Sequence, residues 1–546
     1  MKVNQQISKV LLAGTAITSV AVTPFFSYDP INVPRFLTLL VIGLASLGLL
    51  IVSYGRLIKS DHRLLLLVST LFIIWLGIVL FASKINLAEG LFGVTGRQTG
   101  FLTYLALIAL MAITAALSSN RDLVTASKLL IISGWASGLY GLIQIEDADP
   151  FDWINPYSPV FGLFGNPNFH ASFMGICAVV ALVIFFDAAQ TKRFRWMSLI
   201  FVPVAVLNIY ESKSQQGFLV LMAGIFVFLY LYIRNNPRFS KLSVPYLILT
   251  VISFVAVVLD ILQKSPWKSL LYKESVTFRG DFWRAGWKMT TDNPIFGVGP
   301  DGYRDQYRFS RDLVTAMRPG SDVQTDSAHN VFLDLSASGG LVLLALYILI
   351  IALVLKSAYK IVKREKVFNP GFTAVIAAWV AYTAQSVISI NQIGLAVWGW
   401  VLSGLIIGYE INTRESTKNS FALKSGSNLV VPILAGSVVA LSLGMPLMVA
   451  DATFRSTIKS GEVIKIESSV RQWPKSVIRM TTVAQILREG NLSDRSIVIA
   501  REAVAFNPMN YEAWRELSLQ PNASESERNE ALETMKKLDP FNPNLK

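Results

Sequence analysis

Long apolar runs alternate with short polar connections along most of this chain. A helix needs about 20 apolar residues to cross a bilayer, and about thirteen runs approach or exceed that length. They fall near 7–27, 35–54, 64–83, 100–118, 127–145, 170–187, 196–210, 216–233, 244–262, 331–355, 370–390, 393–411 and 428–450. The pattern predicts an all-α polytopic membrane protein with about thirteen transmembrane helices.

Two polar stretches interrupt the pattern. The first, at about 263–330, separates the ninth and tenth apolar runs, and it combines helix signals with many polar side chains. Connections longer than about 12–15 residues are usually functional or disordered, and the helix signals favour function. The second begins after the last run. We therefore expect a transmembrane domain over 1–450, which includes the large loop, and a separate helical domain over 451–546.

The predicted C-terminal domain contains a recurring motif. WPKS, NPMN and DPFN place Pro474, Pro508 and Pro540 at intervals of about 34 residues, and helix-forming segments such as AREAVAF and NEALETMKKL lie between them. This spacing resembles that of tetratricopeptide repeats. The tail holds two repeats at best, fewer than such stacks usually need, so we expect it to dock on the membrane domain. An unrelated helical hairpin domain is the alternative.

Composition and charge narrow the class of protein. Of 546 residues, 53% are hydrophobic and only 16% are charged, which is typical of membrane proteins. The net charge of +13 does not indicate nucleic-acid binding, because the basic residues cluster in alternate short loops. By the positive-inside rule these loops are cytoplasmic. The N-terminus is then cytoplasmic, and the large loop and the tail are extracytoplasmic. The first apolar run could be a cleaved signal peptide, but we favour an uncleaved span.

Candidate chemistry concentrates in the large loop. His329 and Asn330, in SAHNVFLDL, stand where the loop enters the tenth run, and a histidine there can accept a proton near neutral pH. Asp334 follows Asn330 by one helical turn and could orient the imidazole. A helix-capping or interfacial histidine is the simpler alternative.

The segment FRGDFWRAGWKMTTDNP predicts an amphipathic helix that lies on the membrane surface. Trp283 and Trp287 share one face, Arg279 and Arg284 lie beside them, and Asn-Pro ends the helix. The following GVGPDGY is a glycine-rich turn that could approach an anion through its backbone N–H groups. It lacks the GK[ST] ending of a nucleotide-binding P-loop.

These elements, together with LFGNPNFHASFMG at 163–175 and GVTGRQTGFLTYL at 93–105, resemble the O-antigen ligase and polymerase superfamily of integral membrane glycosyltransferases. The second element is similar to one in members with tetratricopeptide tails. The resemblance implies a GT-C-like helical fold in a bacterial inner (cytoplasmic) membrane. It also implies transfer of a glycan from a polyprenyl diphosphate carrier to an acceptor hydroxyl, with His329 as base, Arg279 holding the diphosphate, and neither metal nor cofactor.

The chain departs from the family at one position. Many ligases carry a Ser-Arg pair where this chain has SKSQQGFLV, so Gln215 or Gln216 replaces an arginine. Lys213 or Arg97 could supply the missing cation. The candidates fall at extracytoplasmic ends of the predicted spans, which suggests one outward-facing cavity. The predicted substrate-binding residues are Arg97, Asn166, Asn168, Lys213, Gln216, Trp283 and Asn330, beside the catalytic pair His329 and Arg279.

We favour a ligase, with a polysaccharide polymerase or a protein O-oligosaccharyltransferase as alternatives in the same class. A lipid-linked glycan flippase or transporter would be expected to carry ionisable groups near mid-membrane, whereas Asp260, Asp334 and Glu410 lie towards span ends. A scaffold would leave His329 and Arg279 without a role. The expected partners are a polyprenyl diphosphate-linked donor, a lipid, glycan or protein acceptor, the membrane, and a protein bound by the tail.

Overall fold

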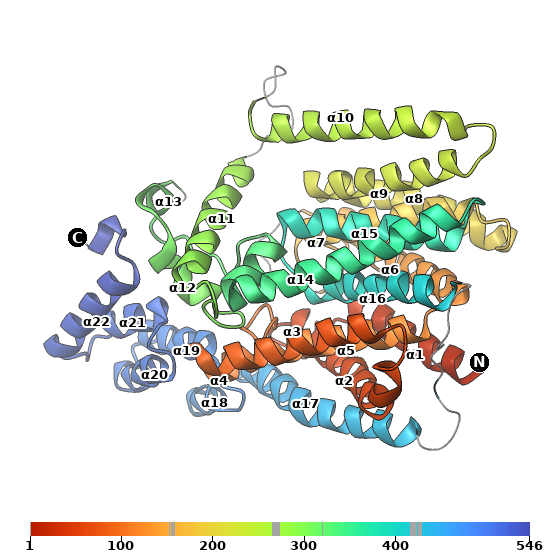
Figure 1. Ribbon diagram of the computed structural model, residues 1–546. Helices are drawn as coiled ribbons and strands as arrows, with labels where there is room; N and C mark the ends of the chain where they lie inside the picture. The colour runs from red at the N-terminus through yellow and green to blue at the C-terminus, as the bar shows by residue number, and fades with distance from the viewer. Residues whose placement is uncertain are drawn as a thin grey trace.

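The computed structural model describes residues 2–151, 153, 159–264, 274–318, 320–414, 423 and 429–545. These residues form helices and loops, with no strand among them (Figure 1). The predicted all-α fold is therefore correct for the described part of the chain. Parts of the predicted large loop, at 265–273 and 319, lie outside it.

Eleven of the described helices are long and apolar enough to cross a membrane. They are α2 Asn32–Leu57, α3 Arg63–Ala82, α6 Asn120–Ile145, α7 Pro167–Phe185, α8 Lys192–Glu211, α9 Gln215–Arg234, α10 Ser243–Ile261 with the preceding η1 Ser240–Leu242, α14 Val331–Arg364, α15 Pro370–Ile388, α16 Ile393–Asn412 and α17 Val430–Ser460.

The other two predicted runs form helices that do not qualify as spans. Helix α1, Lys2–Val20, starts with the polar sequence KVNQQISK, and α5, Phe101–Leu117, has 17 residues. Helix α5 nevertheless lies inside the bundle, in contact with α2 and α16. Its neighbours are protein rather than lipid, so its length does not have to match the bilayer. The prediction of about thirteen spans is thus reduced to eleven plus two shorter or more polar helices.

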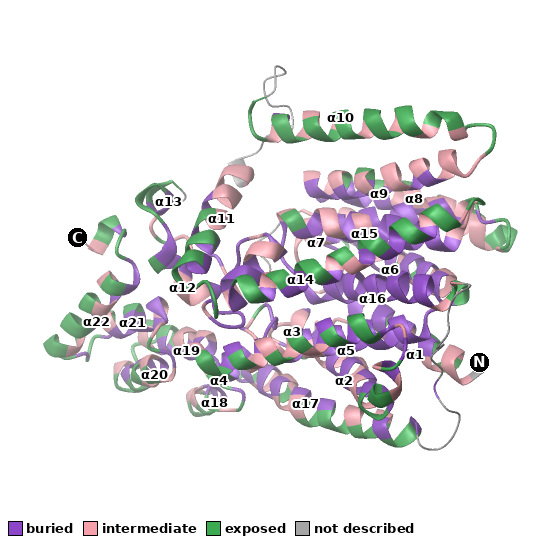
Figure 2. Cartoon of the chain, viewed as in Figure 1, coloured by how far each residue is buried: buried purple, intermediate pink, exposed green. Residues whose placement is uncertain are grey.

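Close backbone contact holds the centre of the bundle together. Every residue of α16 from Ile393 to Ile411 is buried (Figure 2). A Cβ at Gly404 would lie 2.4 Å from the carbonyl oxygen of Met111, and one at Gly408 would lie 2.0 Å from that of Ala115. Only glycine permits α16 to approach α5 so closely, which is the packing mode that membrane helices favour.

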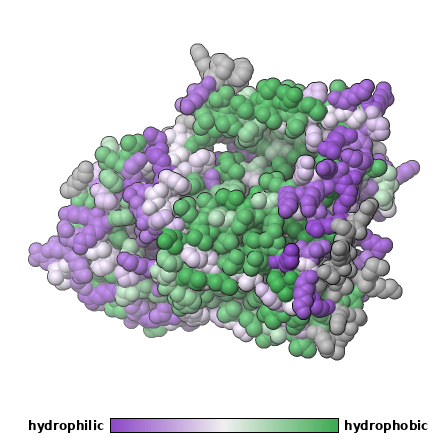
Figure 3. Space-filling view, in the orientation of Figure 1, coloured by the Kyte–Doolittle hydropathy of each residue, from purple (hydrophilic) through white to green (hydrophobic). Residues whose placement is uncertain are grey.

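Helix α10 shows the opposite pattern. Asp260 is its only buried residue, and its helical neighbours are α9 and η1. Figure 3 shows hydrophobic side chains over this helix and over the middle of the bundle face below it. An apolar helix with so little protein contact is typical of a surface that faces lipid.

A break in α14 receives the glycine-rich turn. Gly339 and Gly340 leave helical geometry, with φ of +71° at Gly340. The carbonyl oxygens freed there accept hydrogen bonds from the backbone of the turn, from Val298 N–H to Ala337 at 2.7 Å and from Gly299 N–H to Ser338 at 3.1 Å. Two of the N–H groups considered for anion binding therefore anchor the turn to α14 instead.

Short helices gather at one end of the bundle (Figure 1). From the large loop and the connection before α5 come α4 Leu87–Phe92, α11 Glu274–Asp292, α12 Tyr303–Ser310 and α13 Leu313–Met317. From the tail come α18 Val463–Ser469, α19 Val477–Glu489, α20 Ser493–Phe506, α21 Tyr511–Ser518, α22 Glu525–Leu538 and η3 Pro543–Leu545. Helix α19 packs on α20 and α21 on α22, and the tail contacts the loop helices, as expected for a docked helical appendix.

Candidate active site

His329 lies in a short connection immediately before α14. Its backbone has a φ of +52°, which is uncommon outside glycine and asparagine. The N–H of the preceding Ala328 donates to Asp334 Oδ1 at 2.7 Å, and the His329 N–H donates to Ser327 Oγ at 3.3 Å. The imidazole lies against Phe282, with ring centroids 5.6 Å apart. Asp334 therefore orients the backbone that carries the histidine, and no hydrogen bond links its carboxylate to the ring among the described contacts.

Asn330 has a structural task. It is the N-cap of α14, and its Oδ1 accepts hydrogen bonds from the N–H groups of Phe332 at 3.0 Å and Leu333 at 3.1 Å. Asparagine is among the preferred residues for this position. The amide oxygen thus fixes where the helix begins after His329, and substrate binding by Asn330 stays a prediction.

A chain of polar contacts joins α7, α9 and α11. Arg279 Nη2 donates to Gln216 Oε1 at 3.3 Å, and Gln216 Nε2 donates to Ser172 Oγ at 2.8 Å. Gln216, one of the two glutamines expected at the position of a second arginine, therefore lies beside Arg279. It supplies a neutral oxygen that aims the guanidinium, and it adds no second positive charge.

The GNPN element begins the neighbouring helix. Asn166 is the N-cap of α7 and accepts the N–H of Asn168 at 2.9 Å, while Asn168 Oδ1 accepts Ser214 Oγ–H at 2.6 Å. Ser214 directly precedes α9, which carries Gln216. Both asparagines thus stabilise the helix ends around the Arg279–Gln216 contact.

Arg97 is buried and has two acidic partners. Its ion pairs extend to Asp301 at 3.6 Å and Asp326 at 3.7 Å, and its Nη1 also donates to the backbone oxygen of Asp326. Burial lowers the pKa of Arg97, but the charges of Asp301, Asp326 and Asp334 together outweigh burial and raise it above its ordinary value. Because Arg97 is doubly paired, its charge is largely compensated. It anchors the segment that leads to His329.

Lys213 lies in the turn that leads to α9, directly before Ser214. It is exposed, its ammonium pairs with Glu211 at 2.8 Å, and it lies 4.8 Å from the ring centroid of Tyr210. Trp283 packs with Phe282 and the apolar residues around Tyr303 and Tyr307. Its indole Nε1 is buried and meets no acceptor in the described part of the chain.

The electrostatic environment keeps His329 neutral. Burial lowers the pKa of His329 to about 4. The charge of Asp326 acts in the opposite direction, and the positive charges of Arg279 and Arg97 lower the pKa further. Burial also lowers the pKa of Arg279. At neutral pH the imidazole is therefore uncharged and able to accept a proton, and the partly buried guanidinium of Arg279 lies nearby.

A cavity of about 190 Å³ lies between the loop that carries Arg97 and the start of α7. Arg97 and Asn166 both line it, together with Asn32, Thr99 and Gln392, and the aromatic rings of Phe164 and Phe169 form part of its wall. No group of three His, Cys, Asp or Glu side chains suited to a metal ion occurs among the described residues.

Comparison with known proteins places this cluster in context. Residues 200–348 match the O-antigen ligase family. The match begins in α8 and ends within α14, so it includes Gln216, Arg279 and His329. The tail lies outside it, and so do Arg97, Asn166 and Asn168. No curated protein matches the chain.

Several residues of the site escaped the sequence analysis. Asp301 and Asp326 hold Arg97 across more than two hundred positions of sequence. Ser172 and Ser214 lie within the quoted 163–175 and SKSQQGFLV elements but were not singled out there. The position of Asp301 in the GVGPDGY turn and the nearness of Asp326 to the AHN motif were the local signals that could have suggested a role. The multi-pass membrane character and the similarity to O-antigen ligases, in contrast, were predicted correctly.

Proposed function

We propose that this protein is a membrane glycosyltransferase that moves a glycan from a polyprenyl diphosphate carrier to an acceptor hydroxyl on the extracytoplasmic face. The observation that carries the proposal is the nearness of a neutral, partly buried His329 to the partly buried Arg279 inside the region that matches the O-antigen ligase family. The site thus offers a proton acceptor and an anion-binding cation at the same end of the bundle.

Each group has a defined part in the reaction. His329 takes the proton from the acceptor hydroxyl as its oxygen attacks the anomeric carbon of the donor sugar. The new glycosidic bond forms while the bond to the diphosphate breaks, and the electron pair leaves with polyprenyl diphosphate. Direct displacement inverts the anomeric centre. Arg279, held by Gln216, offsets the charge that develops on the leaving group, and its partial burial strengthens this effect.

The remaining candidates support this pair. Arg97 holds the His329 segment, because its own charge is met by Asp301 and Asp326. The buried indole N–H of Trp283 is a donor for a substrate oxygen. Lys213 lies in the solvent-exposed turn before α9, where we assign it no part in the transfer step. We propose ligation rather than polymerisation, on the resemblance of the 93–105 element to ligase-like proteins with tails.

The test is transfer by purified protein from a polyprenyl diphosphate-linked glycan. His329→Ala should lower the rate by roughly 10²–10⁴-fold, the usual contribution of a general base. Arg279→Ala should also lower it strongly. Arg284→Ala is the matched control, because Arg284 lies on the same helix but is half-exposed and paired with Asp281 and Asp312. Full activity in His329→Ala would remove the proposed base.

A further inference from the structure

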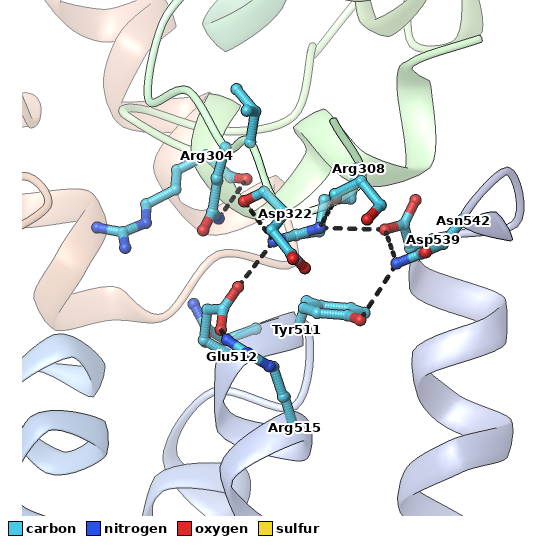
Figure 4. Close-up of polar contacts among 12 residues, drawn as sticks. Arg304, Arg308, Asp322, Tyr511, Glu512, Arg515, Asp539 and Asn542 are labelled. Carbon is cyan, nitrogen blue, oxygen red and sulfur yellow. Dashed lines mark hydrogen bonds and ion pairs between the residues drawn. The ribbon is translucent and has the colours of Figure 1, made fainter. Parts of the chain in front are cut away.

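The tail reaches the large loop through one buried carboxylate. Asp539, which directly follows α22, pairs with Arg311 at 2.7 Å and with Arg308 at 3.2 Å. Asp539 and Arg311 are each 1% exposed and Arg308 is 2% exposed. Figure 4 shows Arg308 between Asp539 on one side and Glu512 on the other, with Tyr511 beneath it. Two buried arginines of the loop thus depend on acidic residues of the tail.

The same two arginines hold the backbone that leads to His329. Arg308 Nη1 and Arg311 Nη2 each donate to the carbonyl oxygen of Ser321 at 2.8 Å. Arg308 Nη2 also donates to the carbonyl of Asp322 at 3.3 Å, and Arg311 Nη1 to that of Val323 at 3.2 Å. Each guanidinium therefore connects the tail to residues 321–323.

The segment from 321 to 329 contains no helix or strand, so it has no regular backbone hydrogen bonds of its own. Its other end is fixed by Arg97, which binds the carbonyl of Asp326, and by Asp334, which binds the N–H of Ala328. Backbone groups that lack secondary structure must find partners elsewhere, and here side chains provide them at both ends. The position of His329 is therefore set by charged side chains outside the segment.

We propose that Asp539 is a positioning residue for the active site, so that the docked tail holds His329 in its reactive place through Arg308 and Arg311. The inference rests on the proposed role of His329 as base. Its physical basis is charge balance. Without the carboxylate of Asp539, two neighbouring guanidinium groups would remain buried close together with only part of their charge met, which is costly. They would separate and draw in water, and the carbonyls of residues 321–323 would lose their donors.

Hydrogen–deuterium exchange on the full-length protein in lipid nanodiscs tests this directly. Asp539→Asn should accelerate amide exchange within residues 321–329 by about tenfold, the equivalent of losing one charge-assisted hydrogen bond. In the transfer assay the same variant should lower kcat and leave KM for the donor unchanged. Asp539→Glu, which retains the charge, should restore most of the protection.

Two further variants make the result specific. Glu516→Gln removes a buried carboxylate that pairs with Arg488 inside the tail, at 2.8 Å, and should leave residues 321–329 protected. Asn544→Ala removes only the exposed hydrogen bond from Nδ2 to Ser321 Oγ, at 2.8 Å. It should give a smaller acceleration in the same segment, and it provides the test if Asp539→Asn does not fold.

Unchanged exchange at 321–329 in Asp539→Asn, or equal acceleration in Glu516→Gln, would overturn the proposal. The exchange measurement does not depend on catalysis, so the two proposals can fail separately. If the exchange responds as expected but the wild-type protein transfers no glycan, the coupling of tail and segment stands and the proposed reaction falls.

Discussion

The membrane bundle and the region at its functional end are stabilised in different ways. In the bundle, α16 is buried along its length and meets α5 through glycines, with apolar side chains filling the space around them. At the end of the bundle that carries the candidate site, buried ion pairs hold the loops and the tail together. Arg97 pairs with Asp301 and Asp326, and Asp539 holds Arg308 and Arg311.

The difference shows which interactions fix the position of each region. Close apolar packing fixes the bundle in one arrangement, because any added atom meets backbone. A polar network, in contrast, fixes the loops only while each buried charge keeps its partner. The active site should therefore respond to small changes of charge that leave the bundle intact, and the following predictions test that contrast.

The largest effect is expected in the bundle. Gly408→Ala places a methyl group 2.0 Å from the backbone oxygen of Ala115, and overpacking of this kind costs about 1–3 kcal/mol. We expect a lower thermal midpoint and a lower yield of folded protein in detergent. Gly55→Ala is the control, because no atom lies within 4 Å of its added Cβ. Equal stability of the two variants would contradict the packing account.

A smaller effect concerns the pH dependence of tail docking. Glu89 and Asp305 share the side-chain amide of Asn507, at 2.9 and 2.7 Å. Burial, followed by the charge of Asp305, raises the pKa of Glu89 to about 8. A carboxyl whose folded pKa is raised stabilises the docked state at low pH, and this contribution is lost as the pH rises towards 8.

Docking of the tail should accordingly weaken as the pH rises from 6 to 9. Amide exchange in α19 and α20 measures it. Glu89→Gln should remove much of the pH dependence, whereas Glu502→Gln, at the exposed pair with Arg471, should retain it. The same slope in Glu89→Gln as in the wild type would exclude Glu89 as its source.

The smallest expected effect is a shift in the pKa of His329 when Arg279 is replaced. The chain has three histidines, so the His329 resonance can be assigned by substitution and followed by NMR with labelled histidine. We expect a pKa of about 4, and a higher value in Arg279→Gln, because a neighbouring positive charge is removed. The rise should be about one pH unit or less. An unchanged pKa would mean that Arg279 does not act on the imidazole.

The sequence predicted the bundle well for a physical reason. Long apolar runs admit few structures in a bilayer, so all thirteen predicted ranges became helices. Two of these helices do not qualify as spans, α1 because its start is polar and α5 because it is short. The amphipathic helix with Arg279 also formed, as α11, and its packing on α14 and α12 could not be read from its own pattern.

The site was predicted only in part, because its geometry depends on contacts between distant positions. Local motifs located His329, Arg279 and Gln216, and the structure joins the last two directly. Asn166 and Asn330 were predicted to bind substrate, and the structure shows that each is the N-cap of a helix. Asparagine before an apolar run suits either role, so the sequence could not separate them. The pairing of Arg97 with Asp301, and of Arg311 with Asp539, leaves no local signal in the sequence.

The most direct test of the central claim is the size distribution of polyprenyl-linked glycan extracted from cells that express His329→Ala in place of the wild type. The account predicts long glycans that accumulate on the carrier, because their final transfer to the acceptor has failed. Single repeat units alone would indicate a polymerase instead. A wild-type profile together with intact surface glycan would contradict the account.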